Sequence, residues 1–310
     1  MPLTEGDVRI HWQVHGPADG EPVVLIGGGA TQLIDWRDEF VALLVGRGLR
    51  VVRFDHRDTG LSQRFGDGPD AVDGGYSVQE AAIDVLRVLD ALDLDAAHLV
   101  GHSMGGIMAQ YLALDHPSRV RSMVLVSTIP GLDPAYLVGP QLAAADLVPW
   151  PALPRAEALA QFVETQRTLH AASTGFSFDE DDERTHAARQ LDRGYEPNAF
   201  QRHWSALLRA DDRLARLAAV TVPTAVVHGT EDATLRPLAA EQLAAAVPGA
   251  ELLLIDGMGH RLERALWPVY EEVVVRTVGR AAATGARGAA RAAGSARAAG
   301  TARAAGSARA

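Results

Sequence analysis

The side chain most able to do chemistry is Ser103, which stands among glycines in the stretch AHLVGHSMGGIM. An aliphatic run ends just before this serine and another begins just after it, as expected where a strand passes into a helix. Gly101, Ser103 and Gly105 have the spacing of a nucleophile elbow, a turn so sharp that the flanking glycines leave no room for side chains. The alternative is an ordinary tight turn, and because the chain holds 30 glycines the motif alone does not decide.

A serine hydroxyl is a weak nucleophile unless a base takes its proton and an acid orients that base. In a parallel sheet of this kind the order along the chain is serine, acid, histidine. Downstream of Ser103, two apolar runs pass into the stretches HGTED and DGMGH, which end in Asp232 and His260. The carboxyl ends of parallel strands are where such folds place their sites. We therefore expect a Ser103–Asp232–His260 triad, with Glu231 as the alternative acid and a helix N-cap as the alternative role of Asp232.

Two backbone amides are candidates for binding a developing oxyanion. Met104 follows the serine at the start of a predicted helix, where N–H groups point outward. A second donor is expected in the loop after an earlier strand, and here the run PVVLI is followed by three glycines, of which we assign Gly29. A flexible turn is the alternative. Phosphate binding is disfavoured because neither G-x-x-x-x-G-K-[ST] nor G-x-G-x-x-G continues from these glycines.

Other polar residues near these stretches have simpler expected roles. We expect His102 to point away from any substrate and His228 to be packed at a strand end. The acidic run Asp179–Glu183 is interpreted as solvated surface rather than as a cation site. No metal is expected, because neither H-E-x-x-H nor paired Cys and His occurs in the sequence.

The elements that must position these residues alternate between strand-like and helix-like runs. Seven strand candidates are the ranges 8–14, 22–26, 49–54, 97–100, 120–126, 222–227 and 251–255. Helical spacing marks the ranges 77–92, 104–114 and 239–247, the first opened by a capping box of Ser77 and Glu80. Apolar strands separated by helices predict an α/β fold, a mostly parallel central sheet with helices on both faces.

The alternation breaks in the middle of the chain, where proline clusters and helix-like stretches replace strand candidates. We therefore expect an α/β core over 1–130 and 220–279 and a helical cap over 131–219, inserted after strand 6, the strand ending near Val126. Residues 280–310 repeat an Ala/Gly/Arg unit without large apolar residues, which predicts a disordered or loosely helical tail. A tether for nucleic acid or an anionic surface is the alternative role of this tail.

Composition excludes several classes of partner. The net charge is −10, and because residues 280–310 hold six arginines and no acid, the rest of the chain carries −16. An acidic body disfavours nucleic-acid binding, which needs a basic patch. Without cysteine, a secretory signal or an apolar run of transmembrane length, the sequence predicts a soluble cytoplasmic protein that does not bind membranes, a monomer or a homodimer.

Several motifs together resemble one family over about residues 5–275. They are RFDHRDTGLS (53–62), GHSMGG at the elbow, FDE (178–180), RGYEP (193–197), HGTED, GMGHRL and ALWP. The chain resembles the α/β-hydrolase superfamily, and within it the aclacinomycin methylesterase-like esterases. The resemblance implies the same triad, no cofactor, a helical cap over the pocket, and hydrolysis of a carboxylic ester, such as a methyl ester of a polyketide-type small molecule.

The sequence departs from the family at a few positions. Gly27 replaces a histidine often found before the oxyanion glycine, and Arg236 and Arg261 lie near the site in sequence, where they could alter substrate choice. We expect five aromatic residues of the cap to line the pocket, with core packing as the alternative: Tyr136, Trp150, Phe176, Phe178 and Trp204. The same triad also serves hydrolysis of lactones, amides, peptides or C–C bonds and cofactor-free peroxidation, and the fold also serves non-catalytic small-molecule receptors.

Overall fold

The structure, a computed structural model, describes residues 1–139 and 143–284. Its central feature is a seven-stranded sheet in the order β1-β3-β2-β4-β5-β6-β7, in which only β1 runs antiparallel to its neighbour. The strands are β1 (Trp12–His15), β2 (Glu21–Ile26), β3 (Leu49–Phe54), β4 (Ala97–His102), β5 (Val120–Val126), β6 (Thr224–Gly229) and β7 (Glu251–Ile255). Each overlaps one of the seven predicted runs, so the predicted mostly parallel sheet is confirmed.

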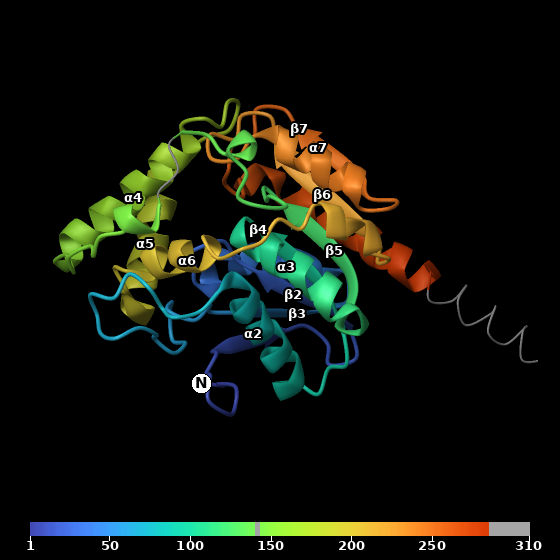
Figure 1. Ribbon diagram of the computed structural model, residues 1–310, viewed down its shortest axis with the longest axis horizontal. Helices are drawn as coiled ribbons and strands as arrows, with labels where there is room; N and C mark the ends of the chain where they lie inside the picture. Colours follow the sequence, from blue (N-terminus) through green and yellow to red (C-terminus); the bar gives the residue numbers. More distant parts are fainter. Residues whose placement is uncertain (140–142, 285–310) are drawn as a thin grey trace, which may run out of the picture.

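Helices cover both faces of this sheet (Figure 1). One face packs against α2 (Val78–Ala91), α3 (Met104–Asp115) and α7 (Pro237–Ala246). The other packs against α1 (Asp38–Gly46) and a C-terminal helix over 267–284. Neighbouring strand residues alternate between the two faces, since Val24 belongs to the first core and Val23 to the second. This explains why the central strands are apolar throughout.

The predicted capping box opens α2. The Ser77 hydroxyl accepts the Glu80 amide at 3.1 Å, and the Glu80 carboxylate accepts the Ser77 amide at 2.7 Å. The amides of Ser77 and Glu80, which have no partner within the helix, are thereby hydrogen-bonded. Short 3-10 helices connect other elements at Leu33–Asp35, Pro117–Arg119, Pro134–Tyr136, Ala144–Asp146, Ala215–Ala219 and Arg264–Leu266.

The segment between β5 and β6 is helical, with α4 (Arg155–His170), α5 (Glu180–Gly194) and α6 (Ala199–Leu207) grouped to one side of the sheet (Figure 1). Among its described residues the only strand-like pairing is an isolated bridge between Leu137 and Leu235. The segment follows the fifth strand along the chain rather than the sixth. The strand that ends at Val126 is β5, the fifth of the seven predicted runs, so the expected strand number was wrong while the position was right.

The C-terminal helix runs five residues past 279, where the predicted tail begins. Arg280 holds this extension to the sheet by donating to Thr224 O at 3.3 Å and Gly249 O at 2.7 Å. The rest of the predicted tail, 285–310, lies outside the described residues. Within the part of the chain that the structure describes, no helix is long and apolar enough to cross a membrane.

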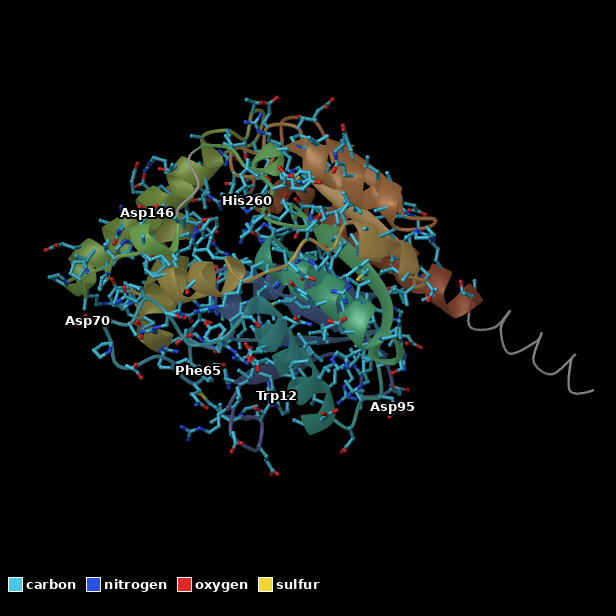
Figure 2. All side chains as sticks on the ribbon, in the orientation of Figure 1. Trp12, Phe65, Asp70, Asp95, Asp146 and His260 are labelled. Carbon is cyan, nitrogen blue, oxygen red and sulfur yellow. The ribbon has the colours of Figure 1, made fainter. Side chains whose placement is uncertain are left out.

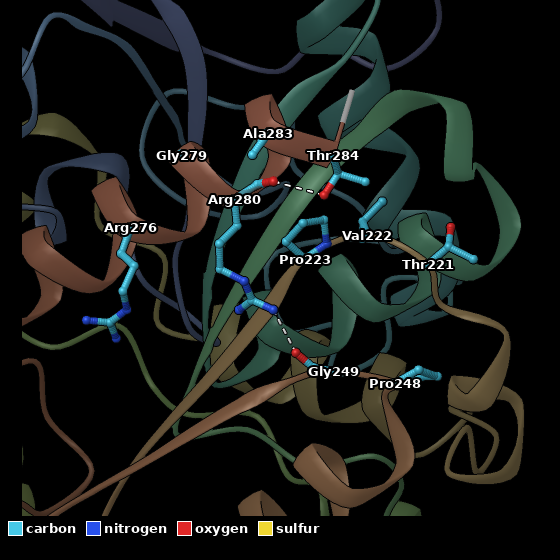
Figure 3. Close-up of a pocket in the computed structure, with 10 residues that line it drawn as sticks. All are labelled: Thr221, Val222, Pro223, Pro248, Gly249, Arg276, Gly279, Arg280, Ala283 and Thr284. Atoms are coloured by element: carbon cyan, nitrogen blue, oxygen red, sulfur yellow. Dashed lines mark hydrogen bonds between the residues drawn. The ribbon is translucent and has the colours of Figure 1, made fainter. Parts of the chain in front are cut away.

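A pocket of about 520 Å³ lies beside this helix (Figure 3). Its walls include Pro223 and Pro248, which precede β6 and β7, together with Arg280. It therefore lies at the amino ends of these strands. Ser103, Asp232 and His260 follow the carboxyl ends of their strands, so the pocket in Figure 3 is separate from the candidate active site.

Candidate active site

The turn between β4 and α3 is built around Ser103. This residue has φ 52° and ψ −118°, a conformation that L-residues rarely adopt. A Cβ on Gly101 would lie 2.4 Å from Gly105 O, and a Cβ on Gly105 would lie 2.3 Å from Ile26 O. These contacts are impossible, so both positions require glycine. Thr128, after β5, donates its hydroxyl to Ser103 O at 2.7 Å and braces the turn from the neighbouring strand.

The structure brings together the three side chains that the spacing singled out. His260 Nε2 lies 3.2 Å from Ser103 Oγ, and His260 Nδ1 lies 2.8 Å from Asp232 Oδ2. The alternative acid, Glu231, is exposed to solvent beside them. Figure 2 labels His260 between the side of the molecule that carries α4 and the side that carries β6 and α7.

Asp232 is held as a charged group although it is buried. Its other oxygen, Oδ1, accepts the amides of Thr234 at 2.8 Å and Leu235 at 2.9 Å. Burial by itself raises the pKa of this carboxyl, but the charge and hydrogen bond of His260 and the Leu235 amide outweigh it and lower the pKa. An ionised carboxylate only accepts, so His260 Nδ1 carries the proton. Nε2 is then the proton acceptor that faces Ser103.

The glycine loop after β2 passes beside the serine. A Cβ on Gly28 would lie 3.4 Å from Ser103 Cβ. Neither the Gly29 amide nor the Met104 amide donates a hydrogen bond to any described residue. The Gly29 amide belongs to the loop after β2, and the Met104 amide belongs to the first residue of α3, directly after Ser103. These are the two places in the chain from which an oxyanion site of this kind takes its donors.

Two further histidines brace the site. His102 Nε2 donates to His260 O at 2.9 Å, and burial lowers the pKa of His102 to about 4, so its ring is neutral. His228 is fully buried, and its Nε2 lies 3.0 Å from Leu235 O and 3.4 Å from Asp232 Oδ2. Burial also lowers the pKa of His228. Both side chains therefore hold the loops that carry Asp232 and His260. This agrees with the packing role expected of His228, while the expectation that His102 points away from a substrate stays a prediction.

Three of the five aromatic residues expected in the pocket contact α7, the core beside the C-terminal helix, or two arginine side chains. Tyr136 is buried, and its hydroxyl hydrogen-bonds to Gln242 of α7. Phe176 packs against the core on the side of the C-terminal helix. Phe178 lies between the guanidinium groups of Arg167 and Arg261, at 5.1 and 5.4 Å. None of these contacts involves the triad, and a role of the three side chains in lining a substrate pocket stays a prediction.

The other two aromatic residues belong to one stack. Trp150 lies on Phe200 with ring centroids 5.8 Å apart, and Phe200 lies on Trp204 at 6.2 Å. The Trp150 side chain remains 41% exposed. A role of Trp150 and Trp204 in lining a substrate pocket stays a prediction.

The expectation that the acidic run is solvated surface is wrong at its last residue. Glu183 is buried and accepts from Arg261 at 2.6 Å and pairs with Arg37 at 3.2 Å. Asp179, at the other end, caps α5. Arg261 is thus bound to α5, while Arg236 donates to Leu137 O at 3.0 Å.

In the described ranges no group of His, Asp and Glu side chains is arranged to hold a metal.

Sequence reasoning missed a set of buried ion pairs that joins α5 and α6 to the loop after β3. Arg193 pairs with Asp55 through two hydrogen bonds, at 3.0 and 2.8 Å. Arg202, 1% exposed, pairs with the fully buried Asp58 at 3.1 Å. The signal was present in part, because the motifs RFDHRDTGLS and RGYEP contain three of these four residues. Their pairing across more than 130 residues had no local signature.

Comparison with known proteins places the chain among hydrolases. The sequence model of the α/β-hydrolase fold matches residues 21–262. The chain is 33% identical over 278 residues to the Variovorax paradoxus protein named "Putative carbamate hydrolase RutD", covering 89% of this chain and 98% of that one. It is 34% identical over 287 residues to the rhodomycin D methylesterase DauP of Streptomyces sp., covering 85% and 93%. Among solved structures it is similar to Est816, described as an N-acyl homoserine lactone degrading enzyme, with a TM-score of 0.62, 28% identity and coverage of 88% and 98%.

Proposed function

Because this chain belongs to the α/β-hydrolase fold family, we propose that it is a serine esterase that cleaves a carboxylic ester through an acyl-enzyme. The observation that carries the proposal is the position of His260, hydrogen-bonded to Asp232 at 2.8 Å and to Ser103 at 3.2 Å. The strained backbone of Ser103 supports it, because strain of this kind concentrates at functional sites.

The proposed reaction begins when Ser103 Oγ attacks the ester carbonyl and His260 Nε2 takes the hydroxyl proton. Asp232 stabilises the imidazolium that forms. The amides of Met104 and Gly29 receive the oxyanion, each contributing on the order of 3 kcal/mol. The tetrahedral intermediate then expels the alcohol, which takes the proton from His260, and leaves an acyl group on Ser103. Water, deprotonated by His260, attacks this acyl group, the bond to Ser103 Oγ breaks as Oγ takes the proton back from His260, and the acid is released.

The proposed substrate is a small-molecule ester, and in its finer form a methyl ester of a polyketide-type compound. The support for the finer form is the 34% identity to a methylesterase over 93% of that protein. A carbamate is the second candidate, since a relative of similar identity is named for carbamate hydrolysis. The same acyl-transfer steps apply to both, so the chemistry of the triad does not separate them.

The proposed steps use side chains, backbone amides and water, and require no metal or cofactor. We assign residues 131–219 to a cap that covers the substrate. The support is that residues of this segment contact both sides of the site, at Ala30 through His203 of α6 and at Gly259 through Ser173 in the connection between α4 and α5.

The test has two parts. A fluorophosphonate probe should label the wild-type protein at Ser103, located by peptide mass spectrometry, while Ser103→Ala should not be labelled. A panel of methyl esters, longer alkyl esters, lactones and aryl carbamates should then give its highest kcat/KM with methyl esters. Absence of labelling in folded protein would overturn the hydrolase proposal, and labelling without turnover of any ester would point to a receptor.

A further inference from the structure

One side chain of α6 reaches the loop that carries the candidate oxyanion donor. His203 is 1% exposed, and its two ring nitrogens contact two separate backbone segments. Nδ1 accepts the amide of Ala30 at 2.8 Å, and Nε2 lies 2.9 Å from Arg57 O. An amide only donates and a carbonyl only accepts, so these partners require a neutral ring with its proton on Nε2. Burial lowers the pKa of His203 to about 4, which keeps the ring in that form at neutral pH.

The residue that His203 holds is strained. Ala30 has φ 60°, in the left-handed region that a side chain with a Cβ rarely adopts. It directly follows Gly29, so the Gly29–Ala30 peptide that His203 holds is joined at the Gly29 Cα to the Gly28–Gly29 peptide, which carries the Gly29 amide. The contact with His203 uses the Ala30 amide and keeps that peptide from relaxing.

The rest of the loop is fixed on its other side. His56 Nε2 lies 2.9 Å from Gly27 O, and the Thr31 hydroxyl donates to Gly28 O at 2.8 Å. Gly29 is thus the one residue of 27–31 without a hydrogen bond to the described part of the chain. Its amide is left available and its neighbours are held in place, which is the preorganisation that an oxyanion site requires.

The base of the His203 side chain is also stiff. Arg202, the preceding residue on α6, pairs with Asp58 at 3.1 Å and donates to Ala71 O at 2.9 Å. The rings of His203 and His56 pack edge to face with centroids 5.7 Å apart. The position of His203 Nδ1 is therefore set by three contacts: the bond of Nε2 to Arg57 O, the packing on His56, and the anchoring of the helix at Arg202.

We propose that His203 is a positioning residue for catalysis, which orients the Gly29 amide toward the oxyanion by holding Ala30 N–H. This inference rests on the proposed function, since it assumes acyl transfer at Ser103. It means that the inserted segment completes the oxyanion site as well as covering the substrate. Removing the contact between His203 Nδ1 and the Ala30 amide should slow the chemical step and leave substrate binding unchanged.

The test uses three variants of the full chain and one matched control. His203→Ala and His203→Phe remove the acceptor, and Phe keeps the volume. His203→Asn restores an acceptor oxygen near the position of Nδ1. The control is His186→Asn, which removes another buried histidine that joins the inserted segment to the core, at 3.2 Å from Asp35, without touching residues 27–31. The measurements are kcat and KM for a p-nitrophenyl ester, the rate of fluorophosphonate labelling, and the thermal midpoint.

We expect His203→Ala and His203→Phe to lower kcat by about 10- to 100-fold, as a displaced oxyanion donor does, with KM unchanged. Labelling should slow in parallel, while His203→Asn should recover most of the rate and His186→Asn should match the wild type. The inference is overturned if the Asn variant is as slow as the Ala variant. It is also overturned if the loss of kcat disappears well below each variant's thermal midpoint, because partial unfolding would then account for it. A wild-type protein that is not labelled would instead overturn the proposed function itself.

Discussion

The two halves of the candidate site are held in place by different physics. The half around Ser103 is fixed by backbone sterics, because glycines at 101 and 105 allow contacts that no side chain permits. The half contributed by α5 and α6 is fixed by buried charges, Arg193 on Asp55 and Arg202 on Asp58. Steric constraints tolerate no substitution at a few positions. Buried ion pairs tolerate the loss of both partners far better than the loss of one.

The difference implies different failures on mutation. Changes near Ser103 should stop chemistry or unfold the core, whereas changes in α5 and α6 should loosen the inserted segment. Four predictions test this division, in order of decreasing effect.

The largest effect is expected at Asp232. Asp232→Asn should lower kcat by about 10⁴-fold, because an amide opposite His260 Nδ1 favours the wrong tautomer. Steady-state kinetics with a p-nitrophenyl ester measure this. Glu231→Gln is the matched control, since Glu231 is adjacent but exposed, and it should be indistinguishable from wild type. Equal losses in both variants would remove Asp232 from the proposed triad.

The second prediction concerns the buried charges. Arg202→Leu should lower the free energy of unfolding by about 3–5 kcal/mol, because it leaves the fully buried Asp58 unpaired. Urea denaturation measures this quantity. The control is Arg155→Ala, which removes the exposed pair of Arg155 with Asp192 in the same segment and should cost less than about 1 kcal/mol. The double variant Arg202→Leu/Asp58→Asn should regain part of the loss, because asparagine removes the charge, keeps an acceptor for the Phe65 amide and tolerates the positive φ of this position. A double variant less stable than the single one would mean that the pair is not the main contribution of Arg202.

The third prediction tests the steric half. Gly105→Ala should destabilise the protein by about 3 kcal/mol, because its methyl group would meet Ile26 O at 2.3 Å and neither backbone segment can move cheaply. Gly46→Ala, at the end of α1, meets nothing within 4 Å and should be neutral or slightly stabilising. Urea denaturation of both variants suffices. Equal stability of the two would show that the elbow relaxes more freely than its contacts suggest.

The most gradual effect, and the smallest for each residue at mildly acid pH, is expected from pH. Burial lowers the pKa of His56, His102 and His203 from 6.5 to about 4 each. Between these values the unfolded chain binds more protons than the folded one, so stability should fall as the pH drops from 6.5 to 4 and change little from these groups below that. Urea denaturation at pH 7, 5.5 and 4.5 measures the slope. His203→Asn should make the slope shallower, and an unchanged slope would mean that His203 does not titrate in this way.

The difference between the half of the site around Ser103 and the half contributed by α5 and α6 also explains what the sequence could and could not predict. Ser103, Asp232 and His260 were predictable because each follows an apolar strand, and parallel strands end at one edge of a sheet. The capping box of α2 was predictable because it is local. His203 and Arg202 were not, because a polar residue in a polar helical stretch gives no sign of its burial until its partner in the loop after β3 is placed beside it.

The aromatic residues of the segment between β5 and β6 are harder to place from the sequence. Tyr136 and Phe178 were expected in the pocket because large rings in a cap commonly line ligand sites. In the structure they contact α7 and two arginines instead. Ring size predicts neither burial nor neighbours here, since Tyr136 is buried whereas Trp150 remains 41% exposed, and the expected role of these rings in lining the pocket stays a prediction.

The long sequence separation of the buried pairs also has a consequence for biosynthesis. Asp58 and Arg202 are 144 residues apart. At about 5–20 residues per second, a ribosome adds the arginine on the order of ten seconds after the aspartate. During that interval the loop after β3 carries carboxylates that cannot leave water at low cost. We expect the nascent chain to keep this loop hydrated and its N-terminal half only loosely assembled, so that the first strands close on their final neighbours only after α6 has emerged.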